Sequence, residues 1–278
     1  MTRIAFSTVA CPNWSLARVA TTASELGYDA VELRTFGFGP SDFVCDPATT
    51  DVAKIRNTFA ERGVGICCLG TSLRFDDPIT PPVIGRVITD TERAVREAKS
   101  LIDLAVQVEC PMVRVFAHEA LCGSHHKSIE LIAERLKMVA DHADKTGVTV
   151  VLENGGDFRT SHDLAEMLGA VGSPLLKAAY SAREATAAGE DPADGVRALG
   201  GRLAQYRVQH RYVEHGERAT PGEMIGLTGI GALDASAFVV FDYDKAWIPS
   251  LPDAEQALRD AGAAMRAADT SGSRAVRV

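Results

Sequence analysis

The chain has 278 residues with a formal net charge of -8, and 46% of them are hydrophobic and 24% charged. The scattered Lys and Arg side chains disfavour a nucleic-acid partner, because phosphate binding needs clustered positive charge. No apolar run approaches the roughly 18 residues of a membrane span, so we expect no membrane association. The amino terminus has no apolar signal core and the six cysteines are irregularly spaced, which predicts a reduced, cytoplasmic protein with small-molecule or protein partners.

Short apolar, β-branched runs alternate with helical stretches along the whole chain. This alternation is typical of parallel strands joined by helical crossovers. Strands are predicted at residues 3–7, 30–34, 64–70, 112–116, 148–154, 175–181, 203–209 and 237–242. Eight β-then-α units spaced by about 30 residues favour a closed (β/α)8 TIM barrel over an open doubly wound sheet.

The predicted barrel forms a single domain over residues 1–267. The last stretch, residues 268–278, is small, polar and basic without apolar periodicity, and we expect it to be a disordered carboxyl-terminal tail. Because TIM barrels carry their chemistry at the carboxyl ends of their strands, the residues that end each run are the candidate site residues. These are Ser7, Glu32, Arg34, Gly70, residues 116–119, Glu153, Ser181, residues 207–210 and Asp242.

Several stretches together resemble the sugar phosphate isomerase/epimerase family, whose members have the xylose isomerase-like TIM barrel. The resemblance spans roughly residues 3–266. It rests on "FSTVACPNWSLARVATTASELGYDAVELR", "LGTSLRFDDP", "VRVF", "VLENGGDFRTSHDLAEML", "AGEDP" and "FDYDKAWIPSLPDAEQAL", taken in their order around the eight units.

The resemblance implies a divalent metal (Mn, Mg, Zn or Co) at the mouth of the barrel, held by Glu, Asp, His and Glu from the fifth to eighth strands. The first ligand falls on Glu153 and is kept. The second falls on Ser181, the third on Arg207, and the fourth on Asp242, which is shorter but still a carboxylate. Two of the four expected ligands are therefore missing.

A neutral hydroxyl replaces a carboxylate poorly, and a guanidinium has no lone pair to donate to a metal. We therefore expect no metal cofactor, with Arg207 in its place as a fixed positive charge paired with Glu153 and Asp242. A weakened metal site is the alternative. A purely structural salt bridge between Glu153 and Arg207 is a further one.

Further candidates surround these positions. The segment at residues 116–128 gathers His118, Glu119, Cys122, His125 and His126 after the fourth predicted strand. A relocated metal site, substrate contacts by His118 or Glu119, and a plain polar loop all remain open for it. His210 is a candidate general acid, or else a solvated loop histidine.

The predicted binding residues complete the set. Arg34 and Arg74 are expected to hold an anionic or polyol substrate, unless they form salt bridges at the rim. The aromatic side chains of Tyr180 and Trp247 are candidates for the pocket wall, although such residues are more often simply packed. The full set of expected substrate-binding residues is Arg34, Arg74, His118, Glu119, Tyr180, Ser181, Gln209 and Trp247.

The sequence thus predicts an isomerase or epimerase that performs acid/base chemistry on a small polyhydroxylated or carbonyl-bearing substrate. The expected catalytic residues are Glu153, Asp242, Arg207 and His210. A metal-free lyase, dehydratase or cyclase would use the same residues, and a non-catalytic barrel that binds a ligand or partner is the rival from another class. Pairing of barrels through their outer helices leaves a homodimer open.

Overall fold

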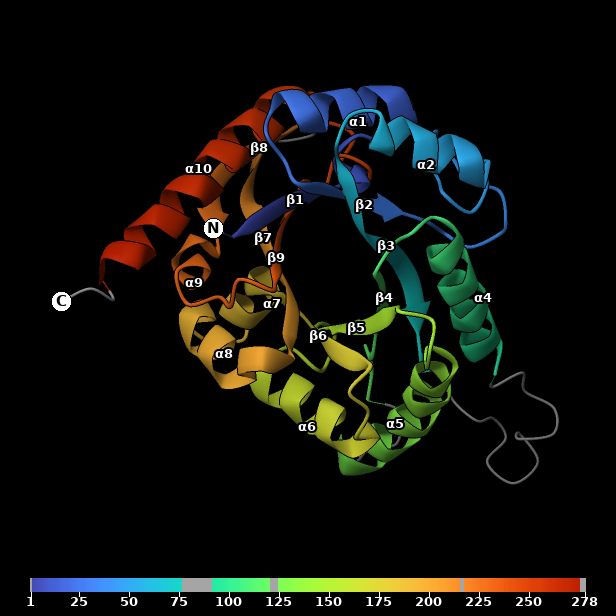
Figure 1. The fold of residues 1–278 in the computed structure, drawn as a ribbon. Coiled ribbons are helices and arrows are strands. Elements are labelled where there is room, and N and C mark those ends of the chain that lie inside the picture. Colours follow the sequence, from blue (N-terminus) through green and yellow to red (C-terminus); the bar gives the residue numbers. More distant parts are fainter. Residues whose placement is uncertain (1, 77–91, 121–124, 216–217, 276–278) are drawn as a thin grey trace.

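The computed structural model describes residues 2–76, 92–120, 125–215 and 218–275. Eight parallel strands pair in a closed ring in the order β1–β2–β3–β4–β5–β6–β7–β9, and β9 returns to β1. Figure 1 shows this ring with the helices outside it. The strands are β1 (Arg3–Ser7), β2 (Ala30–Arg34), β3 (Gly65–Arg74), β4 (Met112–Phe116), β5 (Thr149–Glu153), β6 (Leu176–Ser181), β7 (Leu203–His215), β8 (Arg218–Ile225) and β9 (Phe238–Asp242). The predicted single-domain (β/α)8 barrel is confirmed.

Helices follow the strands and form the outer layer of the barrel (Figure 1). They are α1 (Leu16–Glu25), α2 (Val52–Ala60), α4 (Arg93–Gln107), α5 (His125–His142), α6 (Ser161–Val171), α7 (Ala182–Ala187), α8 (Pro192–Leu199), α9 (Leu227–Ile230) and α10 (Ala254–Ala275), with short 3-10 turns η1 (Thr8–Ala10) and η2 (Gly200–Arg202). Local sequence sets several of their starts. Thr160 and Asp163 form a capping box before α6, and Asp191 caps α8 ahead of Pro192, which satisfies backbone N–H groups that a helix start leaves free.

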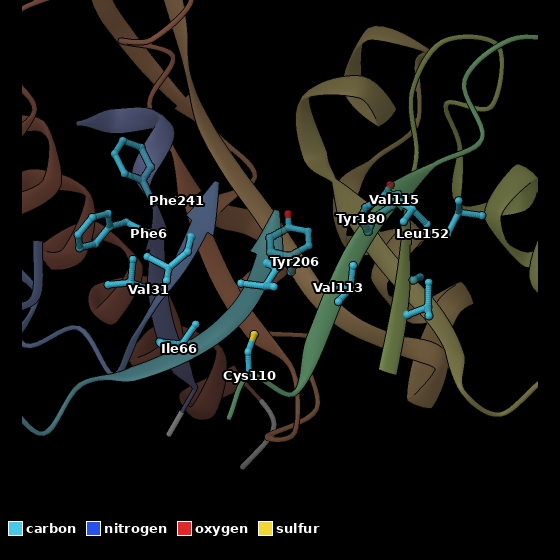
Figure 2. Close-up of a cluster of buried hydrophobic side chains, with 14 of the residues drawn as sticks. Phe6, Val31, Ile66, Cys110, Val113, Val115, Leu152, Tyr180, Tyr206 and Phe241 are labelled. Carbon is cyan, nitrogen blue, oxygen red and sulfur yellow. The ribbon is translucent and has the colours of Figure 1, made fainter. Parts of the chain in front are cut away.

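Two apolar layers hold the barrel together. The larger lies between the strands and the helices, and Figure 2 shows part of it, including Phe6, Val31, Val113, Leu152 and Phe241. A smaller cluster is built mainly of small side chains and fills the inside of the barrel. It contains Ala5, Ala30, Cys67, Cys68, Met112, Val151, Ala179, Phe238 and Val240. Since successive strand residues point to opposite faces, the residues of a strand alternate between the two layers, except in β3, where the register with β2 shifts and the adjacent Cys67 and Cys68 both join the smaller cluster.

The seventh barrel strand differs from the expectation. It was predicted over residues 203–209, but β7 continues to His215 and pairs antiparallel with β8, which was not predicted. Residues 211–225 read RYVEHGERATPGEMI. Charged, glycine and proline residues interrupt the apolar alternation by which a strand is predicted, so the sequence did not indicate this extension. The β7–β8 hairpin extends past Gln209, the last residue of β7 that pairs with a neighbouring barrel strand.

The carboxyl-terminal boundary also differs from the expectation. Residues from 268 onward were expected as a disordered tail, yet α10 continues without a break to Ala275. One contact explains the continuation at its start: the carboxylate of Asp269 accepts hydrogen bonds from the backbone N–H of Thr2 (3.1 Å) and from its hydroxyl (2.5 Å). This part of the helix is therefore tied to the amino terminus. Residues 276–278 lie outside the described residues.

No helix within the described residues combines the length and the apolar character that crossing a membrane requires.

Candidate active site

The candidate site is built on the inward-facing residues at the carboxyl ends of the barrel strands. Above the small apolar cluster, the next inward positions are charged on five strands: Glu32 on β2, Arg114 on β4, Glu153 on β5, Arg207 on β7 and Asp242 on β9. We call these five residues the charged layer. Glu32, Arg114, Glu153 and Asp242 each lie two residues after an apolar residue of the small cluster, and Arg207 lies two residues after the buried Gln205, so the strand pleat points all five the same way.

Arg207 lies at the centre of the charged layer. Its Nη1 donates to Glu32 Oε2 at 2.7 Å and its Nη2 to Glu32 Oε1 at 3.0 Å. On the other side, Nε and Nη2 donate to the two carboxylate oxygens of Asp242 at 2.9 and 2.6 Å, and Nε lies 3.3 Å from Glu153 Oε2. The predicted pairing of Arg207 with Glu153 and Asp242 is present, and Glu32 is an additional partner.

A second arginine, which the sequence analysis did not single out, completes the charged layer. Arg114 donates through Nη2 and Nε to Glu32 at 3.1 and 3.3 Å, and through Nη1 to Glu153 Oε2 at 2.6 Å. Room for this contact depends on Gly70 of β3, where a Cβ would lie 2.8 Å from Glu32 Oε1 and 2.9 Å from Arg114 Nη2. The signal in the sequence was a lone arginine in the middle of an apolar strand, because a charge buried there needs charged or polar partners.

The charged layer shifts the pKa values of its carboxyl groups in opposite directions. Burial acts to raise the pKa of Glu32, but Arg114 and Arg207 outweigh it and hold that pKa well below its usual range. Burial raises the pKa of Asp242 from 3.8 to about 6, with Glu32 and Glu153 adding to the shift and Arg207 opposing it. Glu32 is therefore a permanent anion, while Asp242 titrates near neutral pH.

A cavity of about 580 Å³ opens above the charged layer. Arg114, Glu153, Arg207 and Asp242 form its floor, while Glu32 lies below, wholly buried. The cavity is large enough for a small-molecule substrate. Its walls and rim include Val9, Arg34, Phe116, His118, Asn154, Arg159, Ser181, Arg183, Glu184, Gln209, Asp244 and Trp247.

The four positions at which the family resemblance places metal ligands do not fit a divalent cation. The guanidinium of Arg207 sits among the carboxylates and donates to Asp242, which occupies the lone pairs that a metal would need. At the second position, the hydroxyl of Ser181 accepts the N-cap hydrogen bond of α7 from the backbone N–H of Glu184. No group of three or more His, Cys, Asp or Glu side chains suited to a metal is present in the part of the chain that the structure describes.

Most of the predicted site residues reach the cavity. Arg34, His118, Ser181, Gln209 and Trp247 line it together with the catalytic candidates Glu153, Arg207 and Asp242. Ser181 is fixed through its backbone, which exchanges hydrogen bonds of 2.6 and 3.1 Å with the side-chain amide of Asn154. Gln209 donates to the carboxylate of Asp244 on the rim.

His210 and Tyr180 do not reach the cavity. Each neighbours an inward-facing residue and therefore points outward. His210 Nδ1 lies 2.8 Å from the carbonyl oxygen of Gly222 in the hairpin, and its ring packs edge-on against Phe241. The hydroxyl of Tyr180 donates to Glu190 at 2.7 Å behind the barrel wall. The structure thus gives both residues packing roles in place of the expected general-acid and substrate-binding roles.

Arg74 and Glu119 pair with each other outside the residues that line the cavity. Arg74 Nη2 lies 3.0 Å from Glu119 Oε1 and 2.6 Å from Asp76 Oδ2. The backbone N–H of Glu119 also donates to Asp76, at 2.9 Å. These contacts correspond to the salt-bridge alternative that the sequence left open for Arg74.

The histidine-rich segment is divided between two surroundings. His118 lines the cavity, whereas His125 begins α5 and lies 3.6 Å from Glu166 of α6. His126 pairs with Glu130 on the same helix, at 3.4 Å. Cys122 lies outside the described residues, so the structure does not test the relocated metal site that the sequence left open for this segment.

Comparison with known proteins agrees with this architecture. The family described as "Xylose isomerase-like TIM barrel" matches residues 20–268, so the chain belongs to the xylose isomerase-like TIM barrel family. No curated protein matches the sequence significantly.

Solved structures resemble the whole chain at low sequence identity. An L-ribulose 3-epimerase superimposes with a TM-score of 0.77 at 18% identity, covering 99% of this chain and 97% of that one. The probable 3-DHS dehydratase AsbF of Bacillus anthracis gives 0.72 at 17% identity, with 95% and 99% covered. The 3-keto-D-glucoside 4-epimerase YcjR of E. coli gives 0.70 at 14% identity, with 96% and 100% covered. These similarities show a shared fold, and the neighbours named are enzymes.

Proposed function

We propose that this protein is an isomerase or epimerase that moves a proton beside a carbonyl group of a small polyhydroxylated substrate, without a divalent metal. One observation carries the proposal: a buried arginine, Arg207, stands among the mouth carboxylates at the position where the resemblance places a metal ligand. The structural neighbours include two sugar epimerases, which supports this reaction class.

Glu153 is the stronger candidate for the base. Its Oε2 accepts from Arg114 at 2.6 Å and lies 3.3 Å from Arg207, while no described residue donates to its Oε1. That oxygen belongs to a residue that lines the cavity, so it can reach a carbon-bound proton of a bound substrate. Removal of this proton leaves an enolate or enediolate, and return of a proton to another position or face completes isomerisation or epimerisation.

Asp242 is the candidate for the second acid/base group. It lines the cavity, and it contacts Arg207 on the side opposite to Glu32. Burial raises its pKa above the ordinary value, to about 6. A carboxyl group that exchanges its proton near neutral pH suits the return of a proton to the intermediate. Both of its oxygens accept from Arg207, so proton exchange requires one of these contacts to open.

The two arginines provide the positive charge that the reaction needs. Negative charge develops on the carbonyl oxygen as the proton leaves, and fixed N–H donors in a buried site stabilise it strongly. Arg207 holds the carboxylates apart, and its hydrogen-bond donors are engaged with them. Arg114 lines the cavity beside it. Its Nη1 donates to Glu153 and its Nη2 to Glu32, so each of these nitrogens keeps a second N–H that can donate to the substrate oxygen.

A dehydratase or other lyase is the second candidate, because the probable dehydratase named above superimposes about as well as the epimerases. The same base would remove the proton, and the acid would protonate a departing hydroxyl group. A non-catalytic binding barrel is less well supported, since Glu153 keeps an oxygen without a donor in a cavity of substrate size. The cytoplasmic location and the homodimer stay predictions.

Solvent exchange of substrate protons tests the proposal most simply. The protein is incubated in D2O with a panel of ketoses, aldoses and sugar acids, and the loss of the proton signal beside the carbonyl is followed by NMR. We expect exchange with at least one of these compounds, and Glu153→Gln should slow it by roughly 10²- to 10⁴-fold, the usual contribution of a positioned base. The matched control is Glu61→Gln, which removes an exposed carboxylate at the end of α2. Unchanged exchange in Glu153→Gln would contradict the assignment of the base.

A further inference from the structure

Among the described residues, Arg34 is the cavity arginine that no carboxylate contacts directly. It ends β2, is only 6% exposed, and lines the cavity. Its Nη2 donates to the hydroxyl of Ser72, and its guanidinium lies 4.7 Å from the ring centre of Phe36 and 5.7 Å from that of Trp247. Aromatic faces favour a cation without neutralising its charge.

The other arginines of the cavity each contact a carboxylate. Arg207 and Arg114 hold Glu32 within the charged layer. On the rim, Arg183 lies 3.1 Å from Glu184 and Arg159 lies 3.6 Å from the same residue. No carboxylate of the described residues lies within ion-pair distance of Arg34, and its buried Nε has no acceptor among them. A buried charged group without a counter-ion is costly, and such a group in a cavity indicates a ligand of opposite charge.

We propose that Arg34 binds a carboxylate of the substrate, which makes the substrate a sugar acid or a related hydroxy-keto acid and not a neutral sugar. This inference rests on the proposed function only for the polyhydroxylated character of the substrate. The anionic group would lie beside Phe36 and Trp247, and the carbonyl and its neighbouring carbon would lie over Glu153 and Arg114.

The number of arginines without a carboxylate contact favours a carboxylate over a phosphate. Arg114, Arg159, Arg183 and Arg207 each contact protein carboxylates, so among the described residues Arg34 is the one cavity guanidinium left for an anion, and a single guanidinium suits a singly charged carboxylate. A phosphate monoester carries close to two charges and is normally held by several donors. Burial, together with the charges of Arg114 and Arg207, lowers the pKa of Arg34 to about 9, although Glu32 and Glu153 oppose the shift; a bound anion would stabilise its charged form.

Binding of matched ligands to the wild-type protein tests the inference. Calorimetry compares a hexuronate with its uronamide, which has the same shape and hydroxyl groups but no charge, and with a hexose 6-phosphate. We expect the uronate to bind at least about tenfold more tightly than the uronamide, as a charge-assisted pair with arginine provides. Equal affinity of the uronate and the uronamide would overturn the proposal, and so would tighter binding of the phosphate.

The variant Arg34→Gln identifies the residue responsible. It should remove the preference for the uronate and leave the affinity for the uronamide within about twofold, whereas Arg56→Gln, an exposed arginine on α2, should leave both affinities as in the wild type. A preference that survives Arg34→Gln contradicts the assignment. If Arg34→Gln does not fold, the comparison of uronate and uronamide on the wild-type protein still decides whether the site selects an anion.

The two proposals fail in distinguishable ways. Preference for the uronate without any proton exchange in D2O would retain the anion site and remove the isomerase proposal. Proton exchange with neutral ketoses that depends on Glu153, together with no preference for the uronate, would retain the isomerase proposal and remove the anion site.

Discussion

The side on which a residue emerges from its strand decides whether it belongs to the site. Arg207 and Gln209 face the cavity and His210 does not, just as Ser181 does and Tyr180 does not. The sequence located the strand ends well enough to choose these neighbourhoods. It did not separate adjacent residues, because a shift of one position in a strand moves each side chain to the opposite face.

Arg114 shows a second limit of the sequence at this scale. It forms no motif with its partners: Glu32 is 82 positions away along the chain and Glu153 is 39. Only the closed barrel brings them together. A single charge in an apolar strand predicts that a buried partner exists, but not which residue it is.

The raised pKa of Asp242 leads to a prediction for stability as a function of pH. Because the pKa is about 6 in the folded protein and 3.8 ordinarily, the folded state binds this proton more tightly than the unfolded state does. The stabilisation is therefore complete below about pH 4 and is lost as the pH rises through about 6. Relative to Asp242→Asn, the free energy of unfolding of the wild type should fall by on the order of 2 kcal/mol across this window.

Urea unfolding at several values between about pH 4 and 6.5 measures this difference. Asp141→Asn, which changes an exposed carboxylate on α5, is the control for general effects of charge and should run nearly parallel to the wild type. A wild-type stability that rises over this window relative to Asp242→Asn would show that the pKa of Asp242 is lowered instead of raised.

At the level of elements, the loops after β4 and β5 approach each other closely at the cavity wall, where the carboxylate of Asp157 also accepts a hydrogen bond from the backbone N–H of Ala120 at 2.9 Å. His118 has a positive φ of 82°, and its carbonyl oxygen accepts from the backbone N–H of Asp157 at 2.7 Å. Gly156 makes this possible, since it has a φ of +61° and a Cβ there would lie 2.0 Å from the oxygen of His118. The sequence showed the adjacent glycines but not which of them the fold requires.

These two glycines form a matched pair for a test. Gly156→Ala should destabilise the protein by about 2–3 kcal/mol, because the left-handed backbone and the contact with His118 both become strained. Gly155→Ala should cost less than about 1 kcal/mol, since a Cβ at that position meets nothing within 4 Å. Thermal or urea unfolding of both variants gives the comparison. Equal costs for the two variants would show that the close approach to His118 does not constrain these loops.

At the scale of the whole molecule, the repeat of the barrel made the fold predictable. Each unit carries the same strand-then-helix pattern, so one misplaced boundary does not disturb the count of eight. The departures occur where the pattern is interrupted, in the β7–β8 hairpin and in the carboxyl-terminal part of α10. The loss of two metal ligands stays a prediction from the sequence, and the buried pairing around Arg207 also involves Glu32 and Arg114, which only the assembled barrel reveals.

If Arg207 takes the place of a metal, the purified protein should bind none at this site, and its metal content decides between the two. The measurement is elemental analysis of the purified, dialysed protein, followed by calorimetric titration with Mn2+, Zn2+ and Mg2+. The same titrations are made on a variant that combines Arg207→His and Ser181→Asp, which restores four donors with Glu153 and Asp242. We predict no stoichiometric metal and no saturable binding in the wild type, with binding gained in the variant. Near-stoichiometric metal in the wild type that is lost in Glu153→Ala would contradict the account.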